Sequence, residues 1–376
     1  DQFATGLVGV RSPYGIPRNS LDPAIVPGGS SAGSGVAVAR GIVSFALGTD
    51  TAGSGRVPAA LNNIVGLKPT LGAWSARGVV PACRSVETPS VFALTVADAH
   101  AVHRVATAFD PDEPFSRPVV AGPTPALPAR QVIGVPTAAC LVFDGDAAQE
   151  ASFAEAVATL AATGAEIREV DLTPFYEIAR LLYDGPWVAE RLTVIEDLWA
   201  RDEAAILPVI KRIVGKAQGM SAADTFRGLY RLRELARVTG TALDGLDALC
   251  VPSIPRFVTR AELEADPVAP NSLLGTYTNF VNLLDLAAIA VPTGPRIDGR
   301  PGSVTLIGKA GTDGTLAALA APLEAGAPRL GATGWARSEA APATGLPEGY
   351  MKIVVCGAHM SGLPLNPQLT DRRGVM

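Results

Sequence analysis

The sequence predicts an α/β fold in which a central mixed β-sheet is covered by helices on both faces. Short apolar runs of strand length recur along the chain, and segments with helical periodicity separate them. With 376 residues, 48% of them hydrophobic, the chain can bury a large core. We therefore expect one large domain with a smaller appendage.

The first elements follow a long loop. Repeated Pro, Gly and Asn predict this loop over residues 11–28. Small residues then predict a helix over Gly35–Gly41, and an apolar run predicts a short buried strand over Ile42–Leu47. We expect strand and loop over Val57–Val65 and Gly72–Pro81.

Periodicity places the later elements. The segment Asp144–Thr163, for example, carries Phe153, Val157 and Leu160 on one helical face. Helices are expected over Val91–Thr107, Asp144–Thr163, Thr173–Val214 and Ala222–Thr239. Strands are expected over Gln131–Pro136, Ile167–Leu172, Ala248–Pro252 and Ala287–Pro292.

Composition divides the chain into a main domain over residues 1–331, a linker over 332–349 and the start of a truncated C-terminal domain over 350–376. The linker is rich in Ala, Pro, Gly and Ser, and a strand is expected directly after it. The chain begins at Asp1 without a methionine and ends abruptly. We therefore expect a longer protein, with the N-terminal part of the main domain missing here.

Charge and cysteine usage exclude several function classes. The net charge of −5 leaves no excess of Lys or Arg to neutralise phosphates, which argues against a nucleic-acid partner. No apolar run approaches the ~20 residues that cross a bilayer, so no membrane partner is expected. Four scattered cysteines predict reduced thiols in a cytoplasmic protein. No His, Cys and Asp cluster has metal-ligand spacing, and neither a metal nor another cofactor is expected.

Two turns rich in glycine and serine bracket an apolar segment within Pro27–Pro58. The first turn holds Ser30, Ser31 and Ser34, and the second holds Ser54 between two glycines. Glycine lets the backbone approach a ligand closely, and serine supplies a hydroxyl that can attack or relay a proton. Successive small residues before Ser54 can point several N–H groups at one spot, which is the arrangement of an oxyanion hole.

This pattern resembles the amidase signature family, whose hydrolases use a Ser–Ser–Lys triad. Two serines stand 24 positions apart in that family, as Ser30 and Ser54 do here. The likeness continues through L-N-N-I-V-G-L-K-P-T (Leu61–Thr70) and covers most of the chain to about Gly331. The resemblance implies the amidase-signature fold, with Ser54 as nucleophile and Ser30 as a proton relay that follows a cis peptide bond.

The resemblance also assigns the remaining catalytic groups. A neutral lysine acts as general base in the family, yet residues 1–29 contain no lysine and Lys68 matches a different family feature. We therefore expect the base upstream of Asp1, an active full-length enzyme and an inactive fragment. The resemblance implies that the oxyanion is held by the backbone amides of Thr51, Ala52, Gly53 and Ser54.

Two other motif interpretations are weaker. The run G-S-S-A-G fits the G-x-S-x-G nucleophile elbow with Ser31 as nucleophile, but that elbow must follow a strand directly. His100 and His103 are three residues apart on a predicted helix, where packing is expected rather than base catalysis. A phosphate-binding loop is disfavoured because no G-K-[ST] follows the glycines.

Substrate choice is indicated by stretches outside the serine turns. Gly78–Ser85 and Leu181–Arg191 resemble the allophanate hydrolase group of this family. The resemblance implies that Tyr183 and Arg191 bind the carboxylate of allophanate, for which a hydroxyl and a bidentate cation are suited. It also implies urea degradation with urea carboxylase as functional partner, and we expect a homodimer. Lys352–Asn366 resembles the start of that group's C-terminal domain, and His359 lies in this stretch without an assigned role.

Three alternatives stay open at the level of the sequence. The chain could be an amidase of other specificity or the A subunit of a glutamyl-tRNA amidotransferase, since both use the same serine core. An inactive binding or scaffold module is the third alternative, because residues 1–29 carry no lysine.

Overall fold

The computed structural model describes residues 1–127 and 130–336, together with 364, 366, 367 and 371. The chain divides into two compact units, Asp1–Ala336 and Arg337–Met376. The predicted strand that opens the C-terminal domain, Cys356 and His359 lie outside the described residues, and the division into domains at 331 and 349 stays a prediction.

The first unit is built on one eight-stranded sheet with the strand order β1-β3-β2-β7-β8-β6-β4-β5. Strand β4 pairs in parallel with β5 and β6, and the other neighbours pair antiparallel. The sheet is therefore mixed, which confirms the predicted fold class. The strands are β1 (Phe45–Asp50), β2 (Val65–Lys68), β3 (Thr88–Ala93), β4 (Val132–Pro136), β5 (Glu166–Val170), β6 (Ala248–Pro252), β7 (Leu286–Pro295) and β8 (Pro301–Lys309).

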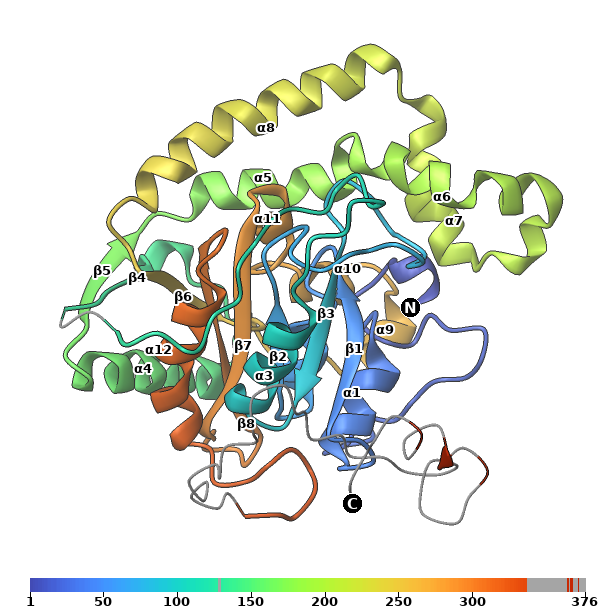
Figure 1. Ribbon diagram of the computed structural model, residues 1–376. Helices are drawn as coiled ribbons and strands as arrows, with labels where there is room; N and C mark the ends of the chain where they lie inside the picture. The colour runs from blue at the N-terminus through green and yellow to red at the C-terminus, as the bar shows by residue number, and fades with distance from the viewer. Residues whose placement is uncertain (128–129, 337–363, 365, 368–370, 372–376) are drawn as a thin grey trace. The chain divides into compact units, whose positions relative to one another are not determined.

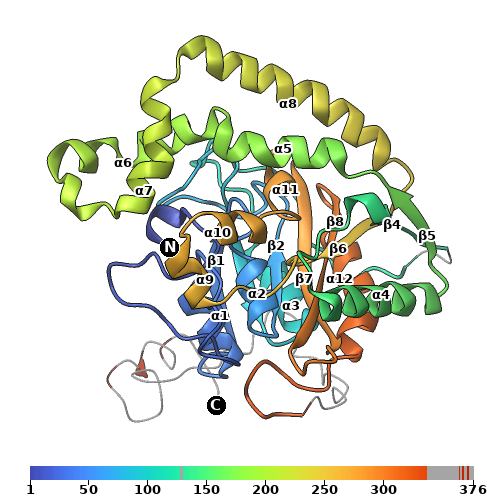
Figure 2. The same ribbon diagram turned by 180° about the vertical axis from the view of Figure 1, so that it is seen from behind.

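Helices cover both faces of the sheet (Figures 1 and 2). Helices α3, α4 and α12 pack on one face, and α1, α2 and α11 pack on the other. Helix α5 lies over α11, and the long helix α8 lies over α5 as the outermost layer (Figure 1). The helices are α1 (Ala32–Ala39), α2 (Val57–Leu61), α3 (Val96–Ala106), α4 (Ala147–Ala162), α5 (Thr173–Asp184), α6 (Trp187–Arg201), α7 (Pro208–Val214), α8 (Ala222–Ala242), α9 (Arg260–Ala265), α10 (Ala269–Leu274), α11 (Asn279–Leu283) and α12 (Asp313–Ala325). Short 3-10 helices are η1 (Gln2–Ala4), η2 (Ala138–Cys140), η3 (Glu203–Ala205) and η4 (Gly215–Gly219).

Alternating side chains of the sheet contribute to two cores, one on each face. In β6, Leu249 and Val251 belong to the core beneath α5 and α11. Their neighbours Ala248 and Cys250 belong to the core beneath α3, α4 and α12. This alternation follows from the two-residue period of a strand, and it makes the sheet a shared wall of both cores.

Much of the predicted element order is confirmed. Strand β6 has the predicted bounds, and α4, α8, β4 and β7 differ from their predicted bounds by a few residues at most. The predicted helical region Thr173–Val214 contains α5, α6 and α7, separated by short breaks. No element was predicted for β8 or α12, whose sequences contain many small residues.

Three predictions near the serine turns are wrong. Strand β1 starts at Phe45 and is not buried: it forms an edge of the sheet, so Phe45 and Leu47 remain 48% and 55% exposed. Val57–Leu61 is helix α2 rather than strand, because Pro58 starts a helical turn. Val91 belongs to β3 rather than to a helix. The strand was missed because β3 is buried along its whole length and therefore shows no alternation of buried and exposed residues.

Candidate active site

The turn that carries Ser54 connects β1 to α2. Ser54 is 1% exposed, and its Oγ is buried without a hydrogen-bond partner among the described residues. Buried hydroxyl groups normally have a partner. The free Oγ is therefore available for a substrate and for a group that accepts its proton.

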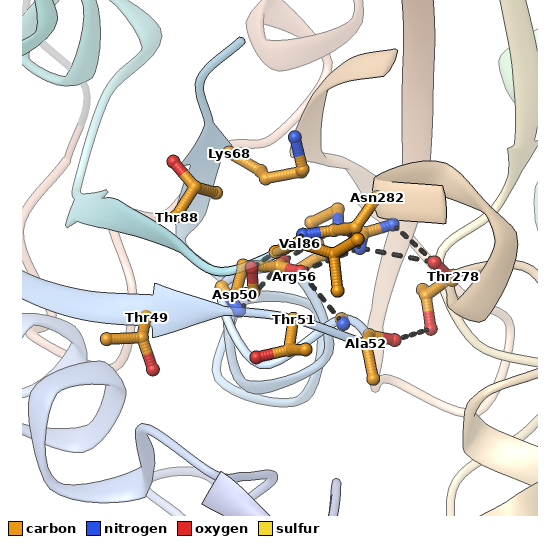
Figure 3. Close-up of polar contacts among 12 residues, drawn as sticks. Thr49, Asp50, Thr51, Ala52, Arg56, Lys68, Val86, Thr88, Thr278 and Asn282 are labelled. Carbon is orange, nitrogen blue, oxygen red and sulfur yellow. Dashed lines mark hydrogen bonds and ion pairs between the residues drawn. The ribbon is translucent and has the colours of Figure 1, made fainter. Parts of the chain in front are cut away.

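A buried ion pair sets the shape of this turn (Figure 3). Asp50 and Arg56 are fully buried, and the guanidinium donates to both carboxylate oxygens, with Nη2–Oδ1 at 2.8 Å and Nε–Oδ2 at 2.9 Å. The same carboxylate accepts the backbone amides of Gly53 at 2.9 Å and Gly55 at 3.0 Å. Bidentate, charge-assisted bonds of this kind are strong and directional. The last residue of β1 thus clamps the turn on both sides of Ser54.

Helix α11 and the residue before it hold the turn from a second side. Thr278 Oγ1 donates to Ala52 O at 2.6 Å, and Asn282 Nδ2 donates to Asp50 O at 2.6 Å (Figure 3). Gly53 has φ +130°, and a Cβ there would overlap the Thr278 side chain, so the position requires glycine. The sequence contains no signal for these contacts, because Thr278 lies 226 residues from Ala52 along the chain.

Bonding inside the turn separates the four predicted oxyanion amides. The structure does not support Gly53 as a donor to the oxyanion, because its N–H is already directed at Asp50 Oδ1. The amides of Thr51, Ala52 and Ser54 donate no hydrogen bond within the described part of the chain. Within the described residues, three of the four predicted donors therefore have no hydrogen-bond acceptor.

The first serine turn is attached to β1. Its Gly29–Ser30 peptide bond is cis, as the resemblance implies. Ser31 Oγ accepts from Thr49 N at 3.2 Å, and Ser34 Oγ donates to Leu47 O at 2.7 Å. Both hydroxyls therefore have structural bonds, which disfavours Ser31 as a nucleophile. Ser30 lines a cavity of about 500 Å³.

Helix α2 brings the two turns together. Asn62, directly after the helix, donates from Nδ2 to Pro27 O at 2.7 Å and to Pro58 O at 2.8 Å. The backbone of the first turn is thereby joined to the helix that starts just after Ser54. Ser30 and Ser54 are thus presented by two turns with shared supports.

Lys68 lies in the buried end of β2, beside the Asp50–Arg56 pair (Figure 3). Its Nζ donates to Pro69 O at 2.9 Å and Leu286 O at 2.7 Å. Burial lowers the pKa of Lys68 to about 8, and the Arg56 charge also lowers it. These bonds direct the ammonium at backbone carbonyls, in agreement with the expectation that Lys68 is not the base.

Tyr183 and Arg191 lie on different helices and meet. Helix α5 ends at Asp184 and α6 starts at Trp187, yet the Arg191 guanidinium carbon lies 5.0 Å from the centre of the Tyr183 ring. Arg191 is 2% exposed, and among the described residues only its Nη1 is bonded, to Thr5 Oγ1 at 3.2 Å. Arg191 Nε, Arg191 Nη2 and Tyr183 OH are buried without partners in the described part of the chain. The carboxylates of Glu87 and Glu190 act on Arg191 electrostatically, but neither forms an ion pair or hydrogen bond with it within the described residues. The free N–H groups of Arg191 and the Tyr183 hydroxyl are therefore suited to a bound carboxylate.

The segment between Ala82 and Glu87 connects the Ser54 turn to α6. Glu87 Oε2 accepts from Thr51 Oγ1 and from Ala82 N, each at 2.7 Å. At the other end, Ser85 donates from N and Oγ to the two carboxylate oxygens of Glu190, also at 2.7 Å each. Sequence reasoning did not identify Glu87. Glu87 stands among polar residues in R-S-V-E-T-P-S (residues 84–90), so its burial had no signal in the sequence.

The two histidines considered for chemistry lie on helix α3. His100 and His103 are buried on α3, and His103 Nδ1 accepts from Trp74 Nε1 at 3.2 Å, as expected for packing residues.

Among residues 1–127 and 130–336, no group of three or more His, Cys, Asp or Glu side chains is placed to hold a metal ion. Within the same residues, no helix has the length and apolar character needed to cross a bilayer.

Comparison with known proteins identifies the family. The Amidase family model matches residues 1–317. The chain belongs to the amidase family. Urea amidolyase of Saccharomyces cerevisiae is 44% identical over 383 residues, covering 98% of this chain and 21% of the yeast protein. The A subunit of the glutamyl-tRNA(Gln) amidotransferase of Afipia carboxidovorans is 31% identical, covering 89% of this chain and 75% of that protein.

Solved amidase structures share the fold. Allophanate hydrolase of Kluyveromyces lactis matches with a TM-score of 0.87 and 43% identity, covering 99% of this chain and 62% of that one. The A subunit of the Thermotoga maritima glutamyl-tRNA(Gln) amidotransferase matches with a TM-score of 0.73 and 26% identity, covering 87% of this chain and 72% of that one. The chain thus spans about one fifth of the length of the urea amidolyases that it matches. The predicted resemblance to the amidase signature family, and within it to allophanate hydrolase, is confirmed.

Proposed function

We propose that this amidase chain is part of an allophanate hydrolase, which cleaves allophanate (urea-1-carboxylate) to ammonia and N-carboxycarbamate in urea degradation. The proposal is carried by the buried Arg191 and Tyr183, whose free donors suit a small substrate with a carboxylate. The likeness to allophanate hydrolase and urea amidolyase over nearly the whole chain supports the same substrate.

In the proposed mechanism, Ser54 Oγ attacks the terminal carbonyl carbon of allophanate. Its proton passes to Ser30 and on to the lysine that the family uses, which is not among residues 1–29. The amides of Thr51, Ala52 and Ser54 stabilise the tetrahedral oxyanion, where one key donor typically contributes ~3–4 kcal/mol. The C–N bond breaks, the leaving nitrogen takes the proton, and ammonia departs. Water then attacks the acyl carbon and frees Ser54.

Substrate selection in this proposal comes from Arg191 and Tyr183. The guanidinium donates to the substrate carboxylate and the phenol donates to the same group, so an uncharged amide would leave both donors unpaired. Urea carboxylase is the proposed functional partner, because that enzyme supplies allophanate from urea. The homodimer and the cytoplasmic location stay predictions.

The test uses the full-length protein that contains this chain. We expect a fluorophosphonate probe to label the wild type and the Ser31→Ala variant, but not Ser54→Ala. We also expect Arg191→Ala to raise KM for allophanate about 100-fold or more, because a buried charge-assisted bond worth about 3 kcal/mol is lost. Circular dichroism checks that each variant is folded.

Two outcomes would overturn the proposal. Intact allophanate turnover in Arg191→Ala would favour an amidase of other specificity, such as a glutamyl-tRNA amidotransferase. Absence of both probe labelling and amide hydrolysis in the wild type would favour a binding module.

A further inference from the structure

One buried carboxylate oxygen beside the site has no hydrogen-bond partner in the part of the chain that the structure describes. Glu87 is buried, and its Oε2 is occupied by Thr51 Oγ1 and Ala82 N. Its Oε1 is also buried, but it has no hydrogen-bond partner within the described residues. Because buried polar atoms in native proteins are nearly always paired, such an atom indicates a missing ligand or water.

Glu87 and Arg191 lie within electrostatic reach of each other. Burial raises the pKa of the Cys83 thiol, while the Arg191 charge lowers it and the Glu87 charge raises it. The Cys83 thiol lies against α6 and donates to Trp187 O at 3.3 Å. Arg191 Nε and Nη2 have no partner among the described residues either. The region between the Ser54 turn and α6 therefore presents unpaired donors from Arg191 and an unpaired acceptor from Glu87.

Allophanate carries a complementary set of groups. Its carboxylate needs donors, and the N–H that joins its two carbonyl carbons needs an acceptor. We propose that Glu87 determines specificity: its Oε1 accepts a hydrogen bond from this bridging N–H while Arg191 binds the carboxylate. This inference rests on the proposed function. Because Glu87 also holds Thr51, it couples recognition of the substrate to the turn that carries Ser54.

The decisive variant is Glu87→Gln in the full-length protein. The glutamine carbonyl can keep the bonds from Thr51 and Ala82, while its amide NH2 takes the place of Oε1. A donor then meets the substrate N–H, so we expect KM for allophanate to rise at least ~10-fold, as for an unpaired buried donor. In a Ser54→Ala background, the affinity for allophanate measured by calorimetry should weaken by the same factor when Glu87→Gln is added. The urea-unfolding midpoint should not change.

An analogue tests the bridging N–H directly. Malonamate has a methylene in place of that N–H and keeps the carboxylate and the terminal amide. Ser54→Ala should bind malonamate about 10-fold or more weakly than allophanate, because the analogue leaves Oε1 unpaired. Glu87→Gln in the same background should lose this preference.

Glu113→Gln is the matched control, since Glu113 is also buried and its Oε1 accepts from Phe115 N at 3.2 Å. We expect this variant to keep the wild-type KM and the preference for allophanate. Wild-type affinity for allophanate in Glu87→Gln would overturn the inference. That result is expected if Glu87 is protonated and donates to the substrate, because the glutamine amide also donates. If Ser54→Ala does not bind allophanate at all, the proposed function fails and the inference with it.

Discussion

At the scale of single residues, the site depends on buried polar groups that differ in how many hydrogen-bond partners the protein gives them. Asp50 and Arg56 pair with each other, whereas Arg191 has no carboxylate partner within the described residues. Lys68 is an intermediate case, since two backbone carbonyls accept its hydrogens without neutralising its charge. The pair can be purely structural, while the free donors of Arg191 suit a ligand.

Lys68 gives a prediction about pH. Burial lowers its pKa from 10.5 to about 8 in the folded chain. Between these values the unfolded state binds a proton that the folded state does not, so folding becomes more favourable as pH rises. We expect the free energy of unfolding of the wild type, relative to Lys68→Met, to increase by about 3 kcal/mol from pH 8 to 10.5. Urea titrations at several pH values measure this difference, and a flat or falling curve would contradict it.

At the scale of elements, short helix α11 supports the Ser54 turn from a distant part of the chain. Asn282 Nδ2 donates to Asp50 O at 2.6 Å and to Val86 O at 2.9 Å, which joins the ends of β1 and of the segment before β3. One side chain therefore sets the separation between the Ser54 turn and the Glu87 segment.

We expect Asn282→Ala to destabilise the fold by about 2–5 kcal/mol, because it leaves two buried carbonyl groups unpaired. In kinetic assays of the full-length protein, kcat should fall more than KM rises, since the turn with the free amides loses its support. Asn279→Ala on the same helix is the control. Its Oδ1 has no partner among the described residues, so its removal should have a much smaller effect on the unfolding midpoint. Equal destabilisation by the two variants would refute the role given to Asn282.

At the scale of the whole first unit, one sheet separates two cores. Cys83 belongs to the core beneath α5 and α11, and Cys250 belongs to the core beneath α3, α4 and α12. Burial raises the pKa of both thiols to about 12. Neither thiol should react while the unit is folded, since the thiolate is the reactive form.

Because the sheet is shared, we expect both cores to unfold together. Thiol labelling at increasing urea concentration, read by peptide mass spectrometry, should then expose Cys83 and Cys250 at the same midpoint. Cys356 is replaced by serine to simplify the labelling. Exposure of one cysteine well before the other would show that the two faces unfold separately.

The sequence alone determined the fold class, the family and the serines proposed to react. These features depend on local patterns: glycine-flanked serines 24 positions apart, apolar runs of strand length and helical periodicity. The same local information failed where burial removes periodicity, as at Val91 in β3, or where a sheet edge exposes an apolar strand, as in β1.

Only the tertiary structure decided which polar groups are already occupied. It directed the Gly53 amide to Asp50, left three neighbouring amides free within the described residues and placed Glu87 between the turn and α6. These outcomes depend on hydrogen bonds between residues far apart in the chain, such as Thr278 and Ala52. A sequence shows that a side chain can donate or accept, whereas folding decides whether its partner comes from the protein or has to come from the substrate.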